Sequence, residues 1–470
     1  MTLEDPAAEP IAGAEAPRDR QDGPHGQTAG QAGAQPFKQT GAPTDGQTSP
    51  RAVDEQVERT AIDATGHAAH PAGAQHTGKT KAELLRPDDM PQAPSSVLDI
   101  FRCFFRVGLT AYGGPAMMPM MRDHILKRGW LTPEGFRLGL SVCQAIPGGT
   151  LMQMAAYTGL NLRGLPGALA GYAGFAVPAT LLITLLSAIY HAYQGLSLTV
   201  SAMQGLSTVV MAIIALAVYD FWQRYARGPR RIGLTLAACG LFLYGVGPAW
   251  IILGAACAGP LVFHNVMAAE VRLATMKVPV RGVLALAALA LAWLGVTFFA
   301  APLLYDLSLS MAKSDLIAFG GYGVFPALYH ETVELHRWLS AATFMDGMAL
   351  AQVTPGPFML GSCFVGYHIA GFLGAITAGV WIFTPSFFIL MLTVPSAGRL
   401  LSWQPFRRAL MGVLSTLGGL ILAVGIQLGR GMDWTPLKVG ICLAATFALW
   451  RKVDPIWVVL CGVGLGLWLL

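Results

Sequence analysis

The sequence predicts an all-α polytopic membrane protein, built from two homologous repeats of inverted topology with broken helices and about 13 transmembrane segments. Three observations lead to this fold class. Of the 470 residues, 54% are hydrophobic and only 12% are charged, whereas soluble domains carry about 25% charged residues. Long apolar windows follow one another from residue 97 onward, and one unusual phrase of sequence occurs twice. This composition excludes a large soluble core.

Apolar windows of helix-spanning length occupy nearly all of the chain after residue 96. Several are shorter than the roughly 20 residues that a full crossing of the bilayer needs, so their ends are approximate. The windows lie at 97–121, 136–160, 165–190, 199–222, 232–247, 249–268, 282–302, 305–329, 340–363, 372–395, 410–427, 436–450 and 455–470.

The first 96 residues differ in composition from the rest. They are rich in Ala, Gly, Gln and Pro and contain no apolar run, so they lack the features of a secretory signal. Such a segment cannot bury enough apolar surface to offset its chain entropy, which predicts a disordered hydrophilic cytoplasmic tail over 1–96. Four of its residues are irregularly spaced histidines without nearby cysteines, which favours a solvated linker over a metal site: His25, His67, His70 and His76.

Two copies of one phrase establish the repeat. LTAYGGPAMMP at 109–119 and LIAFGGYGVFP at 316–326 each run apolar residues into an aromatic residue, a Gly-Gly pair and a proline. Gly and Pro are poor helix formers, so each copy predicts a broken helix at the same place. Further matches follow in the same order with one single-residue slip, since the offset changes from 207 to 208 and back: Trp130 with Trp338, Phe136 with Phe344, QAIPGG at 144–149 with QVTPGP at 352–357, and Pro178 with Pro385.

The repeat divides the chain into three predicted domains after the tail. A first repeat covers 97–270, a linker with an extra transmembrane helix covers 271–304, and a second repeat covers 305–470. Because the chain passes an odd number of windows between the starts of the two copies, the second copy begins on the opposite side of the membrane. Inverted repeats of this kind are common in secondary transporters.

The distribution of Lys and Arg favours a cytoplasmic amino terminus, with one exception. Arg122, Lys127 and Arg128 would lie in an external loop if every window crossed the membrane. Either the first two segments do not cross fully, or this basic loop is functional.

Motifs of enzyme chemistry are missing from the sequence. There is no GxSxG, P-loop or HExxH pattern, and the seven cysteines form no CxxC pair or Cys/His cluster. We therefore expect a protein that is not an enzyme and has no cofactor, no metal site and no nucleic-acid partner. We expect it to be a multi-pass protein of the cell (inner or plasma) membrane, in contact with the lipid bilayer, and a homo-oligomer is compatible with the sequence.

The helix breaks are the candidate binding site of this sequence. A helix interrupted in the membrane exposes backbone N–H groups at the start of its next half, which form a ready site for an oxyanion. Glycine lets a ligand approach the backbone, and an unwound backbone is tolerated where it lines a cavity. The alternative is that these glycines pack helices tightly. We expect the following residues to converge near the midplane: Gly113, Gly114, Pro115, Pro147, Gly148, Gly149, Gly320, Gly321, Pro355, Gly356 and Pro357.

Two cations occupy matching positions before the breaks. Arg106 and Lys313 each lie seven residues before a Gly-Gly pair. A charge in the bilayer centre costs about 2.5–3.5 kcal/mol even on lenient scales, so two cations at symmetric positions suggest a role in balancing a dianion. The alternative is that each side chain snorkels to the interface.

Polar side chains complete the candidate site. Gln144 and Gln352 precede the second break of each copy, where an amide either donates two hydrogen bonds to an oxyanion or joins helices. Among the few acids inside the windows, Asp315 and Asp346 are the candidates for carrying a coupling proton. Asp315 could instead neutralise Lys313.

These motifs also carry a family resemblance. The sequence resembles the chromate ion transporter family in its long two-domain form. The resemblance rests on four features that each occur twice: an aromatic-GGP motif, a Trp-Leu pair, Gln-x-x-Pro-Gly-Gly/Pro and Gly-rich spacing to a membrane proline. FGGYGVFPAL, MDGMALAQVTPGP and FVGYHIAGFLGA match it closely, and the resemblance covers roughly 97–190 and 305–395. The sequence departs from the family at Gly149, which is usually proline, and at Tyr322, where a third glycine is common.

The resemblance implies efflux of chromate, a tetrahedral dianion, and thereby chromate resistance. A permease for sulfate or another small oxyanion is the alternative within transport, because tetrahedral dianions look alike to backbone donors. Outside transport, the alternative is a membrane scaffold or sensor whose working part is the tail. Deletion of 1–90 separates these classes, since a transporter should keep its activity without the tail.

Overall fold

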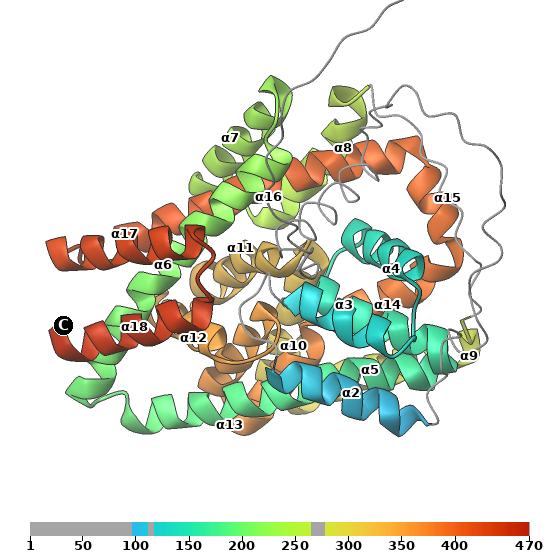
Figure 1. Ribbon diagram of the computed structural model, residues 1–470, viewed down its shortest axis with the longest axis horizontal. Helices are drawn as coiled ribbons and strands as arrows, with labels where there is room; N and C mark the ends of the chain where they lie inside the picture. Colours follow the sequence, from blue (N-terminus) through green and yellow to red (C-terminus); the bar gives the residue numbers. More distant parts are fainter. Residues whose placement is uncertain (1–95, 111–116, 265–277, 470) are drawn as a thin grey trace, which may run out of the picture. The chain divides into compact units, whose positions relative to one another are not determined.

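The first copy of the repeat is helical throughout the part of the chain that the structure describes. The computed structural model describes residues 96–110, 117–264 and 278–469. The predicted tail up to residue 95 and the first Gly-Gly-Pro, at Gly113, Gly114 and Pro115, lie outside these ranges. Figure 1 follows the chain from blue to red. The first copy comprises α2 (Val97–Thr110), α3 (Met117–Lys127), α4 (Pro133–Ala145), α5 (Thr150–Tyr193), α6 (Ser197–Tyr225), α7 (Pro229–Leu243) and α8 (Pro248–Val262).

The second copy follows after one extra helix and has a similar series of elements. Short 3-10 turns and a π-helical turn replace α-helix near its breaks. The extra helix is α9 (Val280–Ala300), and the second copy comprises α10 (Pro302–Ile317), η3 (Gly321–Gly323), α11 (Val324–Tyr329), η4 (His330–Leu335), α12 (Ala341–Val353), η5 (Phe358–Leu360), α13 (Gly361–Trp381), α14 (Thr384–Thr393), η6 (Val394–Ser396), α15 (Ala397–Ser402), α16 (Gln404–Arg430), α17 (Pro436–Trp450) and α18 (Pro455–Leu469).

Matching prolines and glycines set matching boundaries in the two copies. Helices α7 and α8 begin at prolines, and so do α17 and α18. Proline is favourable at the first helical position, where its missing N–H would be unpaired anyway. Gly164 within α5 has φ 62° and ψ −147°, and Gly371 within α13 has φ 58° and ψ −146°. The duplication found in the sequence is therefore also a duplication of backbone conformation.

The break at 146–149 is the tip of a helical hairpin. Gly139 of α4 packs directly against the ring of Tyr157, so α4 and the first part of α5 run side by side in opposite directions. Gly347 and Phe364 form the same contact in the second copy, about a break at 354–357. Helix α4 has 13 residues, or about 20 Å at 1.5 Å per residue, which is short of the roughly 30 Å hydrocarbon core. We infer two re-entrant hairpins, where the sequence had suggested interrupted crossing helices.

Helix α5 also folds back on itself. Gly159 packs on the backbone of Gly167, a contact that eight residues of continuous helix would not permit. The reversal occurs at Arg163–Gly164, so residues 150–162 belong to the hairpin and residues 165–193 form a separate long helix. Gly366 and Gly374 repeat this contact in α13. The predicted boundary between the windows 136–160 and 165–190 lies at this reversal.

The predicted window 97–121 contains two short helices, α2 and the start of α3, and the residues just after α3 lie beside α2. The ring of Trp130, just after α3, lies 6.1 Å from that of Phe104 in α2, and the Arg128 guanidinium lies 5.2 Å over Trp130. The chain has thus returned beside α2 by residue 130. This geometry favours the first alternative, that these segments do not cross fully, and it places the basic loop on the side where α2 begins.

Within the described ranges, five helical stretches are long and apolar enough to cross a membrane, so the predicted count of thirteen spans is not confirmed. Three of these candidate spans precede α10, and an odd number agrees with inverted insertion of the two copies. Helices α8, α17 and α18 are apolar but shorter. The five stretches are Thr150–Tyr193, Ser197–Tyr225, Val280–Ala300, Phe358–Ser402 and Gln404–Arg430.

The last two helices of each copy pack on the long helix of the other copy. Helices α7 and α8 contact α16, while α17 and α18 contact α6, as Figure 1 shows. Small residues allow close approach at these crossings: Gly259 lies on the Arg408 backbone, and Gly205 lies on that of Gly462. The two copies therefore form one interlocked bundle of inverted repeats.

Candidate functional site

The first hairpin tip meets the break that follows α10. The N–H of Gly148 donates a hydrogen bond to the carbonyl of Ala318, and Gly148 and Phe319 form an isolated parallel bridge. The neighbouring Gly149 lies against the sulfur of Met359, which follows the second tip. Segments that are far apart in the sequence thus bring Gly148 and Gly149 beside the residues that precede Gly320.

The predicted glycines fall into two groups. Gly148 has φ 115° and lies against the Ser386 side chain, and Gly356 has φ 113° and lies against Ala179. Both positions combine a backbone conformation that glycine favours with tight packing. Around Gly320 and Gly321, by contrast, an added Cβ would meet no atom of the described residues within 4 Å. The alternative of tight packing therefore describes the hairpin tips but not the Gly320–Gly321 pair, whose backbone is open.

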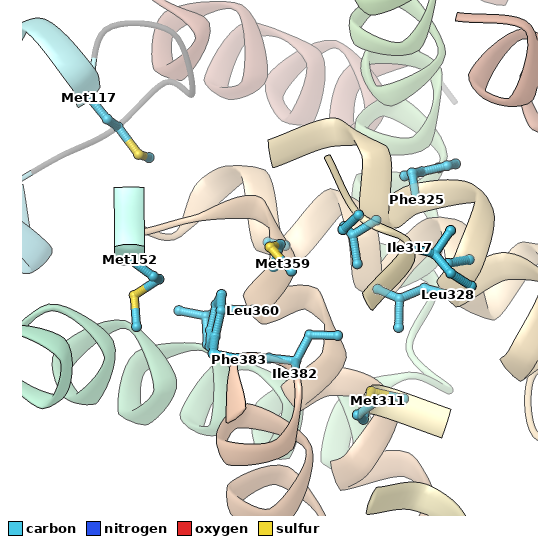
Figure 2. Close-up of a cluster of buried hydrophobic side chains, with 14 of the residues drawn as sticks. Met117, Met152, Met311, Ile317, Phe325, Leu328, Met359, Leu360, Ile382 and Phe383 are labelled. Atoms are coloured by element: carbon cyan, nitrogen blue, oxygen red, sulfur yellow. The ribbon is translucent and has the colours of Figure 1, made fainter. Parts of the chain in front are cut away.

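Apolar side chains surround the tips. Figure 2 shows Met152 at the start of α5 together with Met359, Leu360 and Phe383 from the second copy. All four are fully buried or nearly so, and the prolines Pro355 and Pro357 are buried as well. In such a low-dielectric surrounding, polar groups interact strongly with one another and are costly when unpaired.

A buried carboxyl group lies next to the first tip. Asp315 in α10 is 0% exposed, and its Oδ2 accepts a hydrogen bond of 2.7 Å from the N–H of Ser386, the third residue of α14. Ser386 is also the residue on which Gly148 packs. Within the described ranges, the other oxygen of Asp315 has no hydrogen-bond partner.

Two more buried polar atoms in this region lack partners among the described residues. Gln153 donates from Nε2 to the Pro147 carbonyl at 2.6 Å, which fixes the tip, while its Oε1 is unpaired. The Tyr172 hydroxyl is also buried without a partner, and its ring packs edge-on against Phe383 and Phe387 on either side of Ser386. Unpaired buried polar atoms are rare in native proteins and call for an explanation such as an unseen ion or water.

The two copies differ here. The first copy has Gly108 where the second has Asp315, and Gly108 lies against the Phe175 carbonyl and Pro178. Residues 165–193 remain helical through Pro178, whereas the chain of the second copy is interrupted between α13 and α14, which exposes the N–H of Ser386 to Asp315. The Asp315–Ser386 hydrogen bond therefore has no counterpart in the first copy, which instead contributes Gln153 and Tyr172 to the polar cluster.

The predicted cations lie apart from this carboxyl group. The Lys313 side chain is 45% exposed, and its Nζ is 3.7 Å from Oε2 of Glu331 in the π-helical turn η4. Asp315 bonds Ser386 instead, so the ion pair of Lys313 is not with Asp315. Arg106 is exposed on α2.

The remaining predicted residues occupy three different environments. Gln144 is exposed at the end of α4, and Pro147 is half-buried at the tip. Gln352 is half-buried beside Phe325 and Phe358, whose rings stack 5.6 Å apart, and it lines a void of about 10 Å³ between α6 and α16. Asp346 accepts hydrogen bonds from the hydroxyls of Tyr190 at 2.8 Å and Ser207 at 3.1 Å.

Gln153, Tyr172 and Ser386 are the residues that sequence reasoning missed. Each is a single polar residue inside an apolar window, and a polar residue in a membrane helix is a weak signal of function. For Tyr172 the signal is weaker still, since tyrosine is common in membrane helices.

Two inverted helical repeats, re-entrant hairpins that meet inside the bundle and buried polar atoms at their tips define a multi-pass membrane transporter. Comparison with known proteins agrees with this class. The model of the chromate transporter family matches twice, at residues 98–260 and 305–467, so each copy of the repeat is one family unit. The chain belongs to the chromate transporter family.

Individual relatives support the same assignment. An uncharacterized transporter of Methanocaldococcus jannaschii is 33% identical over 79% of this chain and 94% of its own length. A chromate transport protein of Pseudomonas aeruginosa is 29% identical over 80% of this chain and 93% of its own length. A chromate transport protein of Cupriavidus metallidurans is 29% identical over 62% of this chain and 72% of its own length. No solved structure matches the chain.

Proposed function

We propose that this chain exports chromate from the cell and thereby confers chromate resistance. The observation that carries the proposal is the family match to both copies, together with relatives named as chromate transport proteins. The described geometry agrees with an oxyanion as substrate, since open backbone and packed tips adjoin each other at Gly320 and Gly148.

In this proposal, backbone N–H groups at the breaks bind the dianion. Gly320 and Gly321 present open backbone on one side, and Gly148, Gly149 and Gly356 hold the facing tips in a conformation that side chains would disturb. Backbone N–H groups suit a tetrahedral oxyanion because they donate hydrogen bonds to negatively charged oxygens without requiring particular side chains. By the repeat, Gly113, Gly114 and Pro115 would have the same role in the first copy.

Arg106 and Lys313 balance the charge of the ion in this proposal. The 3.7 Å separation between Lys313 and Glu331 is a loose ion pair, so the ammonium group can turn toward an arriving dianion at small cost. Gln144 and Gln352 act as additional amide donors. Asp315 and Asp346 are the carboxyl groups that would carry a coupling proton.

The membrane potential alone can drive export of a dianion. Moving two negative charges out of an inside-negative cell releases about 4.6 kcal/mol per 100 mV, twice the roughly 2.3 kcal/mol for one charge. Since about 1.4 kcal/mol corresponds to a tenfold gradient, this drives more than three decades of accumulation. Export would then not require a coupling proton, although a coupled proton would add to the driving force.

Radiolabelled chromate flux into everted membrane vesicles tests the proposal. Vesicles with the protein should accumulate chromate faster than vesicles without it, and deletion of 1–90 should leave the flux intact. Uptake of labelled sulfate under the same conditions tests the alternative substrate. A sulfate permease would take up sulfate faster than chromate. Equal flux in vesicles with and without the protein would refute a transport function for chromate.

A further inference from the structure

A cavity of about 280 Å³ lies between the two copies, and residues of the hairpin tips are not among those that line it in the described ranges. Its walls come from the end of α5 and the start of α6 in the first copy, and from the start of α12, the end of α16 with the turn after it, and the start of α17 in the second. A volume of about 10–15 Å³ on this measure already holds one water molecule, so the cavity has room for a small polyatomic ion with water around it.

Lys438 is the cation of this cavity. It is the third residue of α17, and its N–H bonds to Oγ1 of the helix cap Thr435 at 3.2 Å. Its side chain lines the cavity, and the residue is only 9% exposed. Among the described residues, no hydrogen-bond or ion-pair partner faces its ammonium group. A charge on a mostly buried side chain is stabilised by an opposite charge, so the Lys438 ammonium group can pair with an anion that enters the cavity.

The acids of the cavity do not supply a counter-ion. Asp346 and Asp433 both line the cavity, but among the described residues neither forms an ion pair with Lys438; Asp346 accepts hydrogen bonds from Tyr190 and Ser207, and Asp433 is exposed. The first copy offers a comparison, because Arg231 occupies the position of Lys438 in α7. Its guanidinium lies 5.7 Å over the ring of Phe263 and so has a partner.

We propose that the Lys438 cavity is a second binding site for a small tetrahedral oxyanion, which the ion occupies on its way to or from the hairpin tips. The anion pairs with the ammonium group of Lys438 and also faces the amino-terminal end of α17, where backbone N–H groups favour negative charge. The side-chain amides of Gln194 and Gln204 line the same cavity and supply neutral donors. The identity of the ion as chromate rests on the proposed function; the site itself rests on the cavity and its unpaired cation.

Thermal unfolding and equilibrium binding on the full-length protein in nanodiscs test this site. Sulfate is the probe, because it is tetrahedral, divalent and chemically inert. We expect sulfate to raise the unfolding temperature of the wild type by a few degrees, as a ligand that binds only the folded state does. Lys438→Gln should abolish that shift and weaken labelled-sulfate binding at the cavity at least tenfold, while Lys438→Arg keeps most of both.

Lys452→Gln is the matched control, because Lys452 is exposed just beyond the other end of α17. It should behave as wild type. To exclude binding at the tips, the same measurements are made in a Gly321→Leu background, where all remaining sulfate binding should depend on Lys438. Without sulfate, Lys438→Gln should unfold at the wild-type temperature or above it, since the variant loses an unpaired buried charge; a lower unfolding temperature would mean that Lys438 has a structural partner.

The possible outcomes separate this site from the proposed function. Unchanged sulfate binding in Lys438→Gln, or a shift caused by sodium and not by sulfate, would overturn the oxyanion site even if chromate flux is normal. Conversely, loss of sulfate binding in Lys438→Gln without any chromate flux in wild-type vesicles would support the site and refute chromate export.

Discussion

Replacing Gly148 by alanine should damage the fold, whereas the same replacement at Gly321 should not. Gly148 has φ 115°, and a Cβ there would overlap the side chain of Ser386 and approach Nε2 of Gln153 to 2.7 Å. At Gly321, no atom in the part of the chain that the structure describes lies within 4 Å of the corresponding position. The two variants therefore add the same methyl group at two helix breaks, one with tightly packed surroundings and one with open surroundings.

The magnitude follows from two terms. A non-glycine residue in such a sparsely populated backbone region costs about 1–3 kcal/mol, and forcing an extra methyl group into packed surroundings costs about 1–3 kcal/mol more. Gly148→Ala should thus lose about 2–6 kcal/mol, a large share of the roughly 5–15 kcal/mol that keeps a typical protein folded. Gly321→Ala should lose less than about 0.5 kcal/mol, as open positions do.

Thermal unfolding of the detergent-solubilised protein, monitored by size-exclusion chromatography, measures the difference in stability between the two variants. Gly148→Ala should unfold several degrees below the wild type, and Gly321→Ala should unfold at the wild-type temperature. If both variants unfold with the wild type, the tip at Gly148 is not packed as described. If Gly321→Ala falls as far as Gly148→Ala, the backbone at Gly321 is not open.

Three further predictions concern charge and topology. Lys313→Gln should weaken apparent chromate affinity roughly 30–150-fold, equivalent to the 2–3 kcal/mol of a charge-assisted hydrogen bond, while Lys313→Arg keeps part of the activity; normal transport by Lys313→Gln would make the side chain a snorkelling residue. Asp315→Asn keeps an acceptor for the Ser386 N–H, so the protein should fold and retain potential-driven flux. The part of the wild-type flux that is lost when nigericin collapses the pH gradient should be missing in this variant, and an unchanged response to nigericin would remove Asp315 as a proton carrier. Cysteines introduced at Lys127 and Arg227 should react with an impermeant thiol reagent from the same side of the membrane, and labelling from opposite sides would show that the first two segments cross.

The repeat and its break points were predictable from the sequence because proline and glycine act locally. Pro229 and Pro436 start equivalent helices, and Gly164 and Gly371 reverse the chain with nearly equal dihedral angles. The hairpins were harder to foresee. A re-entrant hairpin with two short arms has the same apolar length as one crossing helix, so the window 136–160 could not distinguish them. Only the contact between Gly139 and Tyr157 does so.

The polar part of the site depends on contacts that no local pattern contains. Asp315 was a candidate from its place in an apolar window, but its partner Ser386 lies 71 residues away. Ser386 is available only because the second copy breaks its helix there and the first copy does not. Lys438 is likewise an ordinary lysine near a helix start in the sequence, and only the packing of α17 against α6 buries it.

Chromate flux into everted vesicles carrying the wild type or Gly321→Leu tests the central claim most directly. Everted vesicles expose the cytoplasmic face, so export appears as uptake. We expect the wild type to accumulate chromate in a way that valinomycin with potassium abolishes. Gly321→Leu inserted at the same level should show little flux, because the leucine side chain fills the open space beside the backbone at the break. Flux through Gly321→Leu equal to that of the wild type would contradict an oxyanion site at the helix breaks, and a wild type without flux above empty vesicles would contradict chromate export itself.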